Sequence, residues 1–318
     1  MPPLPYKRPL IKISGEALMG SGRYGIDIAT LDAIAADIAE VCRLGVRPAV
    51  VVGGGNIFRG LSGAAKGMDR VKGDFMGMLA TVMNGLAMEQ TFKRLGQPAV
   101  VYSGLPVPTV CKTFSRDEAC KDMDAGSVVV LAGGTGNPFF TTDTTAALRA
   151  AELGCDAILK ATQVDGIYSE DPKINPNAER FDRLTFSEVL SRDLKVMDAA
   201  AIALARDNAI PIVVFSLHQA GAIAKVMRGE AVCSVAGSDA AGAAFGAGGA
   251  RTMSGFGLCS MSPLSTVSKA LYSARSALPG ESVIALNTLN RFNFFIVAVG
   301  RFASHSFTLS VSFGTPSK

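Results

Sequence analysis

Glycine-rich loops follow three short apolar runs in the first half of this chain, and helical patterns follow the loops. The runs are 9–13, 47–52 and 127–131, and their loops begin at Ser14, Gly53 and Ala132. The repeated order of strand, glycine loop and helix is typical of a parallel sheet that is covered by helices. The sequence therefore predicts an α/β fold.

The remaining apolar runs and helical patterns extend this unit to about residue 235. Further strands are expected at 98–102, 156–160 and 210–215, the last of them being the final strand of the sheet. Helices are expected between Ile26 and Gly45 and over 68–95, 116–123, 143–153, 185–190, 196–208 and 220–228. Since no internal repeat is present, residues 10–235 are expected to form one continuous unit.

The helical pattern at 68–95 carries Met76, Met78, Met83 and Met88. Methionines at helical spacing belong more often to a hydrophobic core than to a cofactor site, so we expect these to pack inside the protein. Asp74 lies early in the same pattern. Its carboxylate could cap the helix or accept a hydrogen bond from a ligand hydroxyl, and the spacing alone favours capping.

Composition narrows the classes of protein to which the chain can belong. An apolar content of 48% supplies a core that needs no disulfide or metal for stability. The six cysteines lack metal-binding spacing and there are only two histidines, so we expect a reduced, cytoplasmic protein without a metal site. We recognise no signal peptide, and the longest apolar run, 294–299, is too short to span a bilayer, so no membrane is expected as a partner.

Charge separates a body from a tail. Up to Val235 there are 25 basic and 25 acidic residues, so the net charge of +4 comes from residues 236–318. Nucleic-acid binding needs a broad basic face and is therefore not expected. The tail is rich in Ala, Gly and Ser, which predicts loop or disorder with short strands at 292–299 and 308–313. The tail has three interpretations: a disordered extension, a segment that binds a partner, or a sequence read past the natural end of the protein, as by a frameshift.

The loop after the third apolar run indicates an anion site. Residues 132–147 read AGGTGNPFFTTDTTAA, which leads from a strand to a helix N-terminus. Free N–H groups and the helix dipole favour phosphate at such a junction, and a purely structural turn is the alternative. The GGGN loop at 53–56 also lets a backbone approach a phosphate closely, although it does not match the GxGxxG motif of dinucleotide sites.

Two lysines occupy similar places in the predicted sheet. Lys12 and Lys160 each lie near the carboxyl end of a strand, where ligands bind in open α/β sheets. A buried lysine is costly unless its ammonium reaches an anion, although Lys12 could instead face water on an edge strand. Asp143 could orient the lysines or a metal hydration shell, or could only begin a helix, and for Asp198 a helix start is favoured.

Six dispersed motifs resemble those of the bacterial uridylate kinases, which have the amino-acid-kinase fold. They are KISGEAL at 12–18, VVGGGNIFRG at 51–60, GDFMGMLATVMNGLAM at 73–88, GTGNPFFTTD at 134–143, LKATQVDGIYSEDP at 159–172 and LKVMDAAAIALARD at 194–207. The resemblance covers residues 6–235 and implies a catalytic domain there, a three-layer α/β/α sandwich with a mainly parallel central sheet. The tail 236–318 has no counterpart in it.

The resemblance implies transfer of the γ-phosphoryl group of ATP, with Mg²⁺, to UMP, which gives UDP and ADP. The UMP phosphate is largely ionised at neutral pH, so positioning and cations matter more than a general base. We expect Lys12 and Lys160 to neutralise charge on the transferring group and Asp143 to orient them. The family also suggests a homohexamer with GTP or UTP as effectors.

The same resemblance implies which residues form the two nucleotide sites. The ATP site is expected to contain Lys12, Ile13, Ser14, Gly15, Gly55, Arg59, Thr162, Tyr168 and Asp171. The UMP site is expected to contain Gly54, Asp74, Thr135, Gly136, Asn137, Pro138, Phe139, Phe140, Thr141 and Thr142. A loop that serves GTP regulation in some members matches Gly20, Ser21, Gly22, Arg23, Tyr24 and Gly25. Tyr168 could stack on a purine or pack locally.

Two other functions stay open from the sequence. One is a kinase of the same fold that acts on a carboxylate or carbamate, against which GTGNPFFTTD and GDFMGML argue. The other is a non-catalytic relative that binds a nucleotide or oxyanion, which the joint presence of Lys12, Arg59, Asp74 and Asp171 disfavours. The sequence does not discriminate among UMP, CMP and dUMP as acceptors.

Overall fold

The chain divides into two units, residues 1–249 and 250–318. The structure, a computed structural model, describes residues 4–58, 67–238, 282–285, 296–303 and 306–313. Arg59, one of the expected ATP-site residues, lies outside the described residues.

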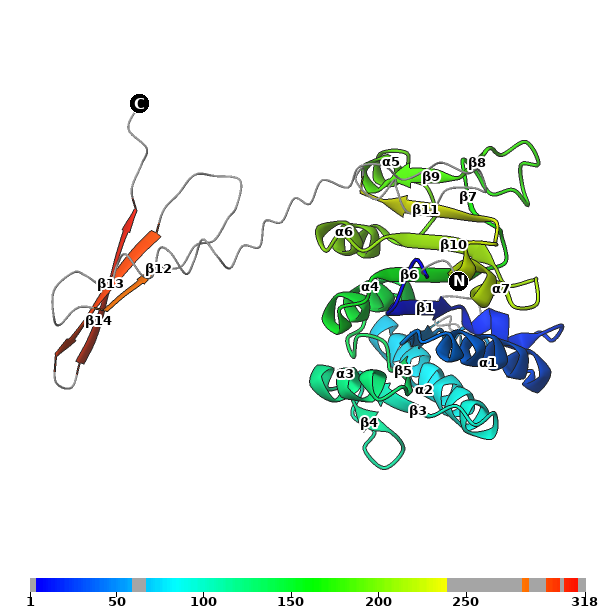
Figure 1. The fold of residues 1–318 in the computed structure, drawn as a ribbon, viewed down its shortest axis with the longest axis horizontal. Coiled ribbons are helices and arrows are strands. Elements are labelled where there is room, and N and C mark those ends of the chain that lie inside the picture. The colour runs from blue at the N-terminus through cyan, green and yellow to red at the C-terminus, as the bar shows by residue number, and fades with distance from the viewer. Residues whose placement is uncertain (1–3, 59–66, 239–281, 286–295, 304–305, 314–318) are drawn as a thin grey trace. The chain divides into compact units, whose positions relative to one another are not determined.

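A nine-stranded sheet of order β4-β3-β5-β2-β1-β6-β10-β11-β9 forms the centre of the first unit (Figure 1). Its strands are β1 Pro9–Ile13, β2 Ala49–Val52, β3 Ala99–Ser103, β4 Lys112–Thr113, β5 Val128–Ala132, β6 Ala157–Thr162, β9 Arg183–Thr185, β10 Ile212–Ser216 and β11 Cys233–Gly237. Every pairing is parallel except that of β10 with β11. A separate ribbon pairs β7 Ile167–Tyr168 with β8 Arg180–Phe181.

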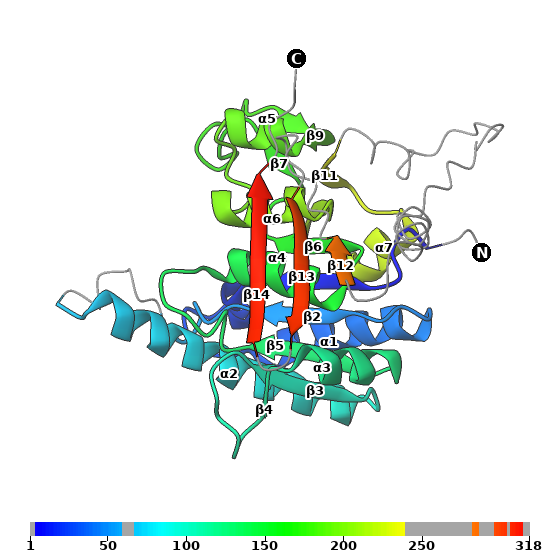
Figure 2. The ribbon, with the colours of Figure 1, turned by 90° about the vertical axis from the view of Figure 1, so that its left-hand side faces the viewer.

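Helices cover both faces of the sheet (Figures 1 and 2). One core packs the sheet against α1 Ile28–Arg43, α2 Arg70–Arg94 and α7 Ala222–Arg228. The opposite core packs it against α3 Arg116–Asp124, α4 Thr142–Leu153, α5 Phe186–Ser191 and α6 Ala199–Asp207. Strand β1 contributes Ile11 and Ile13 to one core and Leu10 to the other, because alternate side chains point to opposite faces. The predicted α/β/α sandwich is confirmed.

Polar groups from strand ends and helix N-termini gather at the carboxyl ends of the sheet's strands. The 3-10 helix η1, Gly15–Met19, directly follows β1. Helix α4 begins after Thr141, whose hydroxyl accepts hydrogen bonds from the Asp143 and Thr144 backbone N–H groups.

Helix α2 is capped by Asp69, which accepts from the Lys72 N–H at 3.1 Å. The prediction that Asp74 caps this helix is therefore wrong, because its start lies one turn earlier.

Strand β10 is not the last strand of the sheet, contrary to expectation. The short helix α7 returns the chain, and β11 then pairs antiparallel to β10 and parallel to β9. The sequence signal is weak because β11 reads CSVAG and β9 has three residues. Neither segment is a long apolar run, since strands near the edge of a sheet need less burial.

The expectation that the methionines of α2 belong to the core is wrong for half of them. Met78 and Met88 are buried, whereas Met76 and Met83 are 41% and 56% exposed. Residues seven positions apart share one face of a helix, so Met76 and Met83 lie together on a face turned away from the sheet. Leu79 is exposed on the same helix.

The second unit contains a three-stranded antiparallel sheet. Its strands are β12 Ser282–Ala285, β13 Ile296–Ala303 and β14 Ser306–Phe313, with β13 in the middle. Strands β13 and β14 overlap the two that the sequence predicts, although 292–295 lie outside the described residues. Strand β12 was not expected, since the tail there lacks a long apolar run.

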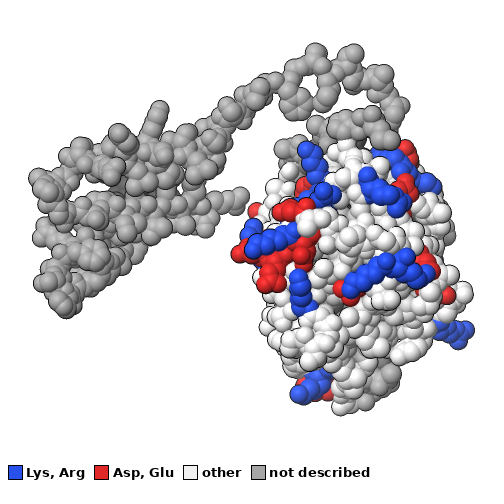
Figure 3. Space-filling view, turned by 60° about the horizontal axis from the view of Figure 1, so that its bottom comes forward, with Lys and Arg blue, Asp and Glu red and all other residues white. Residues whose placement is uncertain are grey.

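The surface of the first unit carries charges of both signs. Figure 3 shows basic and acidic side chains interspersed on one face of it. Within the part of the chain that the structure describes, no helix is both long and apolar enough to cross a membrane.

Candidate active site

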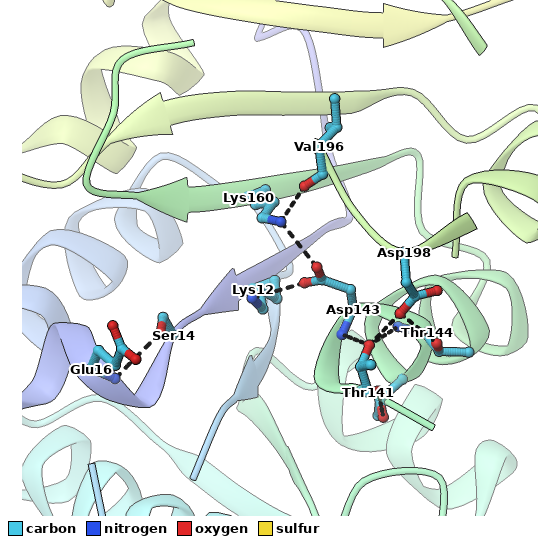
Figure 4. A network of polar contacts seen from close by, with 10 residues as sticks. Lys12, Ser14, Glu16, Thr141, Asp143, Thr144, Lys160, Val196 and Asp198 are labelled. Carbon is cyan, nitrogen blue, oxygen red and sulfur yellow. Dashed lines mark hydrogen bonds and ion pairs between the residues drawn. The ribbon is translucent and has the colours of Figure 1, made fainter. Parts of the chain in front are cut away.

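Lys12, Lys160 and Asp143 form a partly buried charge cluster at the carboxyl ends of β1 and β6 (Figure 4). The two lysines are register partners on these adjacent parallel strands, so they lie side by side. Asp143 lies in the first turn of α4, and its two oxygens lie 2.8 Å from the Lys12 Nζ and 3.0 Å from the Lys160 Nζ. Since β1 lies between β2 and β6, Lys12 does not face water from an edge strand.

The cluster keeps a surplus of positive charge. Burial raises the pKa of the Asp143 carboxyl, but the nearby Lys12 and Lys160 ammonium groups outweigh it and hold that pKa below its usual range. Burial lowers the pKa of Lys160, the Asp143 charge opposes this, and the like charge of Lys12 lowers it further. The Asp198 charge also raises the pKa of Lys160. Asp143 is nevertheless the one carboxylate in direct contact with both described ammonium groups, and this arrangement favours an additional anion beside them.

Hydrogen bonds from neighbouring elements fix the position of this cluster. Lys160 also donates to the Val196 carbonyl. Asp198 accepts from the Ala201 N–H at 2.8 Å and caps α6, as the favoured interpretation of this residue predicts. It also accepts from the hydroxyls of Thr141 and Thr144, which ties the start of α4 to α6. The turn that carries Asp143 is therefore held from two sides.

Two glycine turns pack backbone against backbone beside the lysines. A Cβ atom on Gly15 would lie 2.7 Å from the Gly53 carbonyl oxygen and 2.7 Å from the Gly55 nitrogen, so only glycine fits there. Ser14, before Gly15, accepts a hydrogen bond from the Glu16 N–H at 3.3 Å. The two turns therefore pack main chain against main chain, with no room for a side chain between them at Gly15.

Three of the cavities lined by described residues open around these groups. A cavity of about 290 Å³ is lined by Lys12, Ser14, Lys160 and Thr162, and an adjoining one of about 370 Å³ shares Lys160 and Thr162 with it. The second also contains Tyr168 and Asp171. Of the expected ATP-site residues, Lys12, Ser14, Thr162, Tyr168 and Asp171 thus line these two cavities, whereas Gly15 lines neither and Ile13 packs its side chain into the core.

The third cavity gathers part of the expected UMP site. It has a volume of about 400 Å³, and its walls include Gly54, Asp74, Phe140, Thr141 and Thr142. Gly55, expected on the ATP side, also lines it. The residues of the expected UMP segment that do not line this cavity are Thr135, Gly136, Asn137, Pro138 and Phe139.

Asp74 nevertheless contacts that segment directly. Its carboxylate accepts from the Phe139 N–H at 2.7 Å and from the Arg70 Nε at 2.8 Å. Phe139 has a φ of 72°, a left-handed conformation that is uncommon outside glycine, and its ring lies 5.5 Å below the Arg70 guanidinium. Sequence reasoning missed Arg70, although its position four residues before Asp74 on a helix is a signal of pairing.

Two further expected residues have local partners. The Tyr168 hydroxyl donates to the Asp165 carboxylate at 2.7 Å, so the tyrosine both lines a cavity and bonds within its own loop. In the expected effector loop, Gly25 exchanges two hydrogen bonds of 2.9 Å with Asn56, while Tyr24 is exposed. Asn56 is buried next to the second glycine turn, and sequence reasoning missed it.

The chain is similar to known kinases in sequence and in structure. The sequence model of the amino acid kinase family matches residues 7–216. The uridylate kinases of Brucella anthropi and Rhizobium meliloti are 58% and 59% identical to the chain, which covers 96% and 93% of them with 72% and 70% of its own length. Crystal structures of the UMP kinases of Ureaplasma parvum and Bacillus anthracis match with TM-scores of 0.70 and 0.71 at 37% identity, over 73% and 74% of this chain and 98% and 97% of theirs.

Proposed function

The chain belongs to the amino acid kinase family, and we propose that it is a uridylate kinase, which transfers the γ-phosphoryl group of ATP to UMP and releases UDP and ADP. The Lys12–Asp143–Lys160 cluster carries this proposal. Both lysines line the donor-side cavities, and Asp143 directly follows Thr142 of the acceptor-side cavity. The positive charge therefore lies where the two nucleotides would meet.

The donor is assigned to the two cavities that share walls. Adenosine occupies the one lined by Tyr168 and Asp171, and its phosphates extend along Lys160 toward Lys12 and the Ser14–Gly15 turn. UMP occupies the cavity lined by Gly54 and Asp74. Arg59, from the same motif as Gly54, is proposed as a further phosphate contact on the donor side.

The reaction needs orientation and charge neutralisation. An oxygen of the UMP phosphate attacks the γ-phosphorus, the bond from that phosphorus to the β,γ-bridging oxygen breaks, and ADP leaves with the electron pair. No base is required, because the attacking oxygen is already ionised at neutral pH. Lys12 and Lys160 stabilise the charge that develops on the transferring group, while Asp143 fixes their positions.

Mg²⁺ is proposed to enter with ATP. Among the described residues, no group of three or more His, Cys, Asp or Glu side chains could hold a metal ion. The donor set therefore fits an ion that the phosphate oxygens of the nucleotide hold, which is the usual mode for Mg²⁺. In that complex the ion neutralises phosphate charge.

The test is formation of ADP from ATP in the presence of UMP, followed in a coupled assay. UMP should stimulate turnover strongly over ATP alone, and CMP, dUMP, carbamate and small carboxylates serve as alternative acceptors. A carboxylate or carbamate that outperforms UMP would indicate a different kinase of this fold. Binding of ATP and UMP without turnover would indicate a non-catalytic relative.

We also propose a cytoplasmic homohexamer in which residues 6–235 form the catalytic domain. The exposed side chains of Met76, Leu79 and Met83 on α2 support association, since an apolar face is stabilised by being covered. GTP and UTP are proposed as effectors, with residues 20–25 as one contact region. Light scattering gives the subunit number, and turnover with each effector added shows the direction of regulation.

A further inference from the structure

Helix α2 carries a buried polar stripe on the face that it turns to the sheet. Asn84 is completely buried and Thr81 is 6% exposed. Neither is among the expected nucleotide contacts, although Thr81 also lines the acceptor-side cavity. A buried polar group is costly unless hydrogen bonds satisfy it. What these two side chains bond to therefore indicates why they are there.

Asn84 holds the glycine turn that follows β2. Its Nδ2 donates to the Gly53 carbonyl at 2.7 Å and to the Asn56 Oδ1 at 2.7 Å. The Asn56 Nδ2 donates back to the Asn84 Oδ1 at 3.1 Å. A Cβ on Gly15 would lie 2.6 Å from the Asn56 Oδ1, so this amide pair packs directly against the first glycine turn as well.

Thr81, three residues earlier, holds the start of the acceptor-side loop. Its hydroxyl accepts from the Gly133 N–H at 2.7 Å and donates to the Met78 carbonyl at 2.6 Å. Gly133 has a φ of 69°, and a Cβ there would lie 2.4 Å from the Ser103 hydroxyl, so the backbone has one narrow position. The hydroxyl thus fixes where the acceptor-side loop leaves β5.

We propose that Thr81 and Asn84 are positioning residues on one rigid helix. Asn84 acts through Asn56 on the Ser14–Gly15 turn of the donor side, Thr81 acts on the acceptor-side loop, and the helix keeps the two at a fixed separation. Three residues of α-helix span about 4.5 Å, and hydrogen-bonded helix backbone does not stretch. In-line transfer tolerates a misplacement of only about 1 Å between the reacting groups. The inference rests on the proposed function, because it concerns the alignment of ATP with UMP.

The sharpest probe is a compound that joins adenosine and uridine through a chain of phosphates. Such a ligand gains affinity over the separate nucleotides only when both half-sites are in register. Thr81→Val keeps the side-chain shape but leaves the Gly133 N–H without its acceptor. In this variant the Kd of the joined ligand should rise, and its fold-increase should exceed by about tenfold the product of the fold-increases in the Kd values of ATP and of UMP. The kcat should fall by a similar factor.

Three further variants separate alignment from general stability. Thr81→Ser restores the hydroxyl and should recover wild-type affinity for the joined ligand. Asn84→Ala should behave as Thr81→Val does. Asp37→Asn, which alters a buried group that caps α7 far along the chain from both turns, should lower the melting temperature without the selective loss.

The inference is overturned if Thr81→Val loses no more affinity for the joined ligand than the two separate losses predict, or if Asp37→Asn shows the same selective loss. The Thr81→Val and Thr81→Ser pair decides the question even if Asn84→Ala does not fold. If the wild-type chain gains nothing from joining the nucleotides, the proposed function fails and the inference fails with it. If the wild type gains and the variants keep the gain, only the inference fails.

Discussion

Lys12 and Lys160 bring more positive charge into the first unit than Asp143 neutralises. The sequence predicts that both lysines lie near strand ends, and the register of β1 with β6 brings them side by side. The Asp143 carboxylate lies within ion-pair distance of both ammonium groups.

Removing the Lys12 ammonium should slow the chemical step. We expect Lys12→Ala to lower kcat by roughly 10²–10³, because a cation next to the transferring group is lost. The measurement is ADP formation at saturating ATP and UMP. A loss of less than about tenfold, or roughly 1.4 kcal/mol in the barrier, would remove Lys12 from the mechanism.

Asp74→Asn should mainly weaken the use of UMP. Asp74 holds the Phe139 N–H and lines the acceptor-side cavity, so we expect the KM for UMP to rise about tenfold with little change in the KM for ATP. Asp69→Asn is the matched control, since asparagine also caps helices well and Asp69 only caps the same helix. An unchanged UMP dependence in Asp74→Asn would refute the assignment.

The Asp143 carboxylate should make the free energy of unfolding depend on pH in the acid range. Its pKa lies below the ordinary value of 3.8, so the unfolded chain binds this proton more tightly than the folded chain. The stabilisation is complete above pH 3.8 and is lost as pH falls through the lower, folded pKa. Denaturant unfolding should show the advantage of wild type over Asp143→Asn shrinking in acid, and an advantage that grows in acid would contradict this sign.

At the scale of elements, the packing of α7 on α1 depends on a buried carboxylate. Asp37 of α1 accepts from the Ile223 and Ala224 N–H groups at 2.8 Å and 2.9 Å. The Arg228 guanidinium of α7 also pairs with Glu40 at 2.7 Å. These contacts join residues more than 180 positions apart and satisfy the first turn of a short helix.

We expect Asp37→Asn to lower the free energy of unfolding by about 1–3 kcal/mol, since an amide oxygen cannot replace both carboxylate oxygens as acceptors. Denaturant titration measures the loss, and activity at saturating ATP and UMP should stay near that of wild type. Glu40→Gln is the control, because its pair with Arg228 is partly exposed to solvent and should contribute less than the buried Asp37 contacts. Equal losses in the two variants would contradict the role given to Asp37.

At the scale of the whole molecule, the first unit contains every described residue of the proposed site. The second unit has its own three-stranded sheet. Less than three quarters of this chain aligns with the relatives, and that part covers almost their full length. Catalysis is therefore expected to depend on the first unit alone.

A chain that ends at residue 249 should fold and phosphorylate UMP with a kcat within about twofold of the full chain, because compact units that bury their own cores fold independently. Circular dichroism and the coupled assay provide the measurements. Failure of this shortened chain to fold, or a large fall in its kcat, would show that residues 250–318 contribute to the active first unit.

The sequence by itself determined the α/β class, most helices and strands, and the segments that bear the site, because apolar periodicity and glycine placement are local properties. Only the tertiary structure decided that Asp143 joins Lys12 to Lys160, that Asp69 rather than Asp74 caps α2, and that β11 and β9 extend the sheet. Thr81 and Asn84 were missed for the same reason. Their hydrogen-bond partners lie on other elements, and spacing along one helix cannot show which loops pack against it.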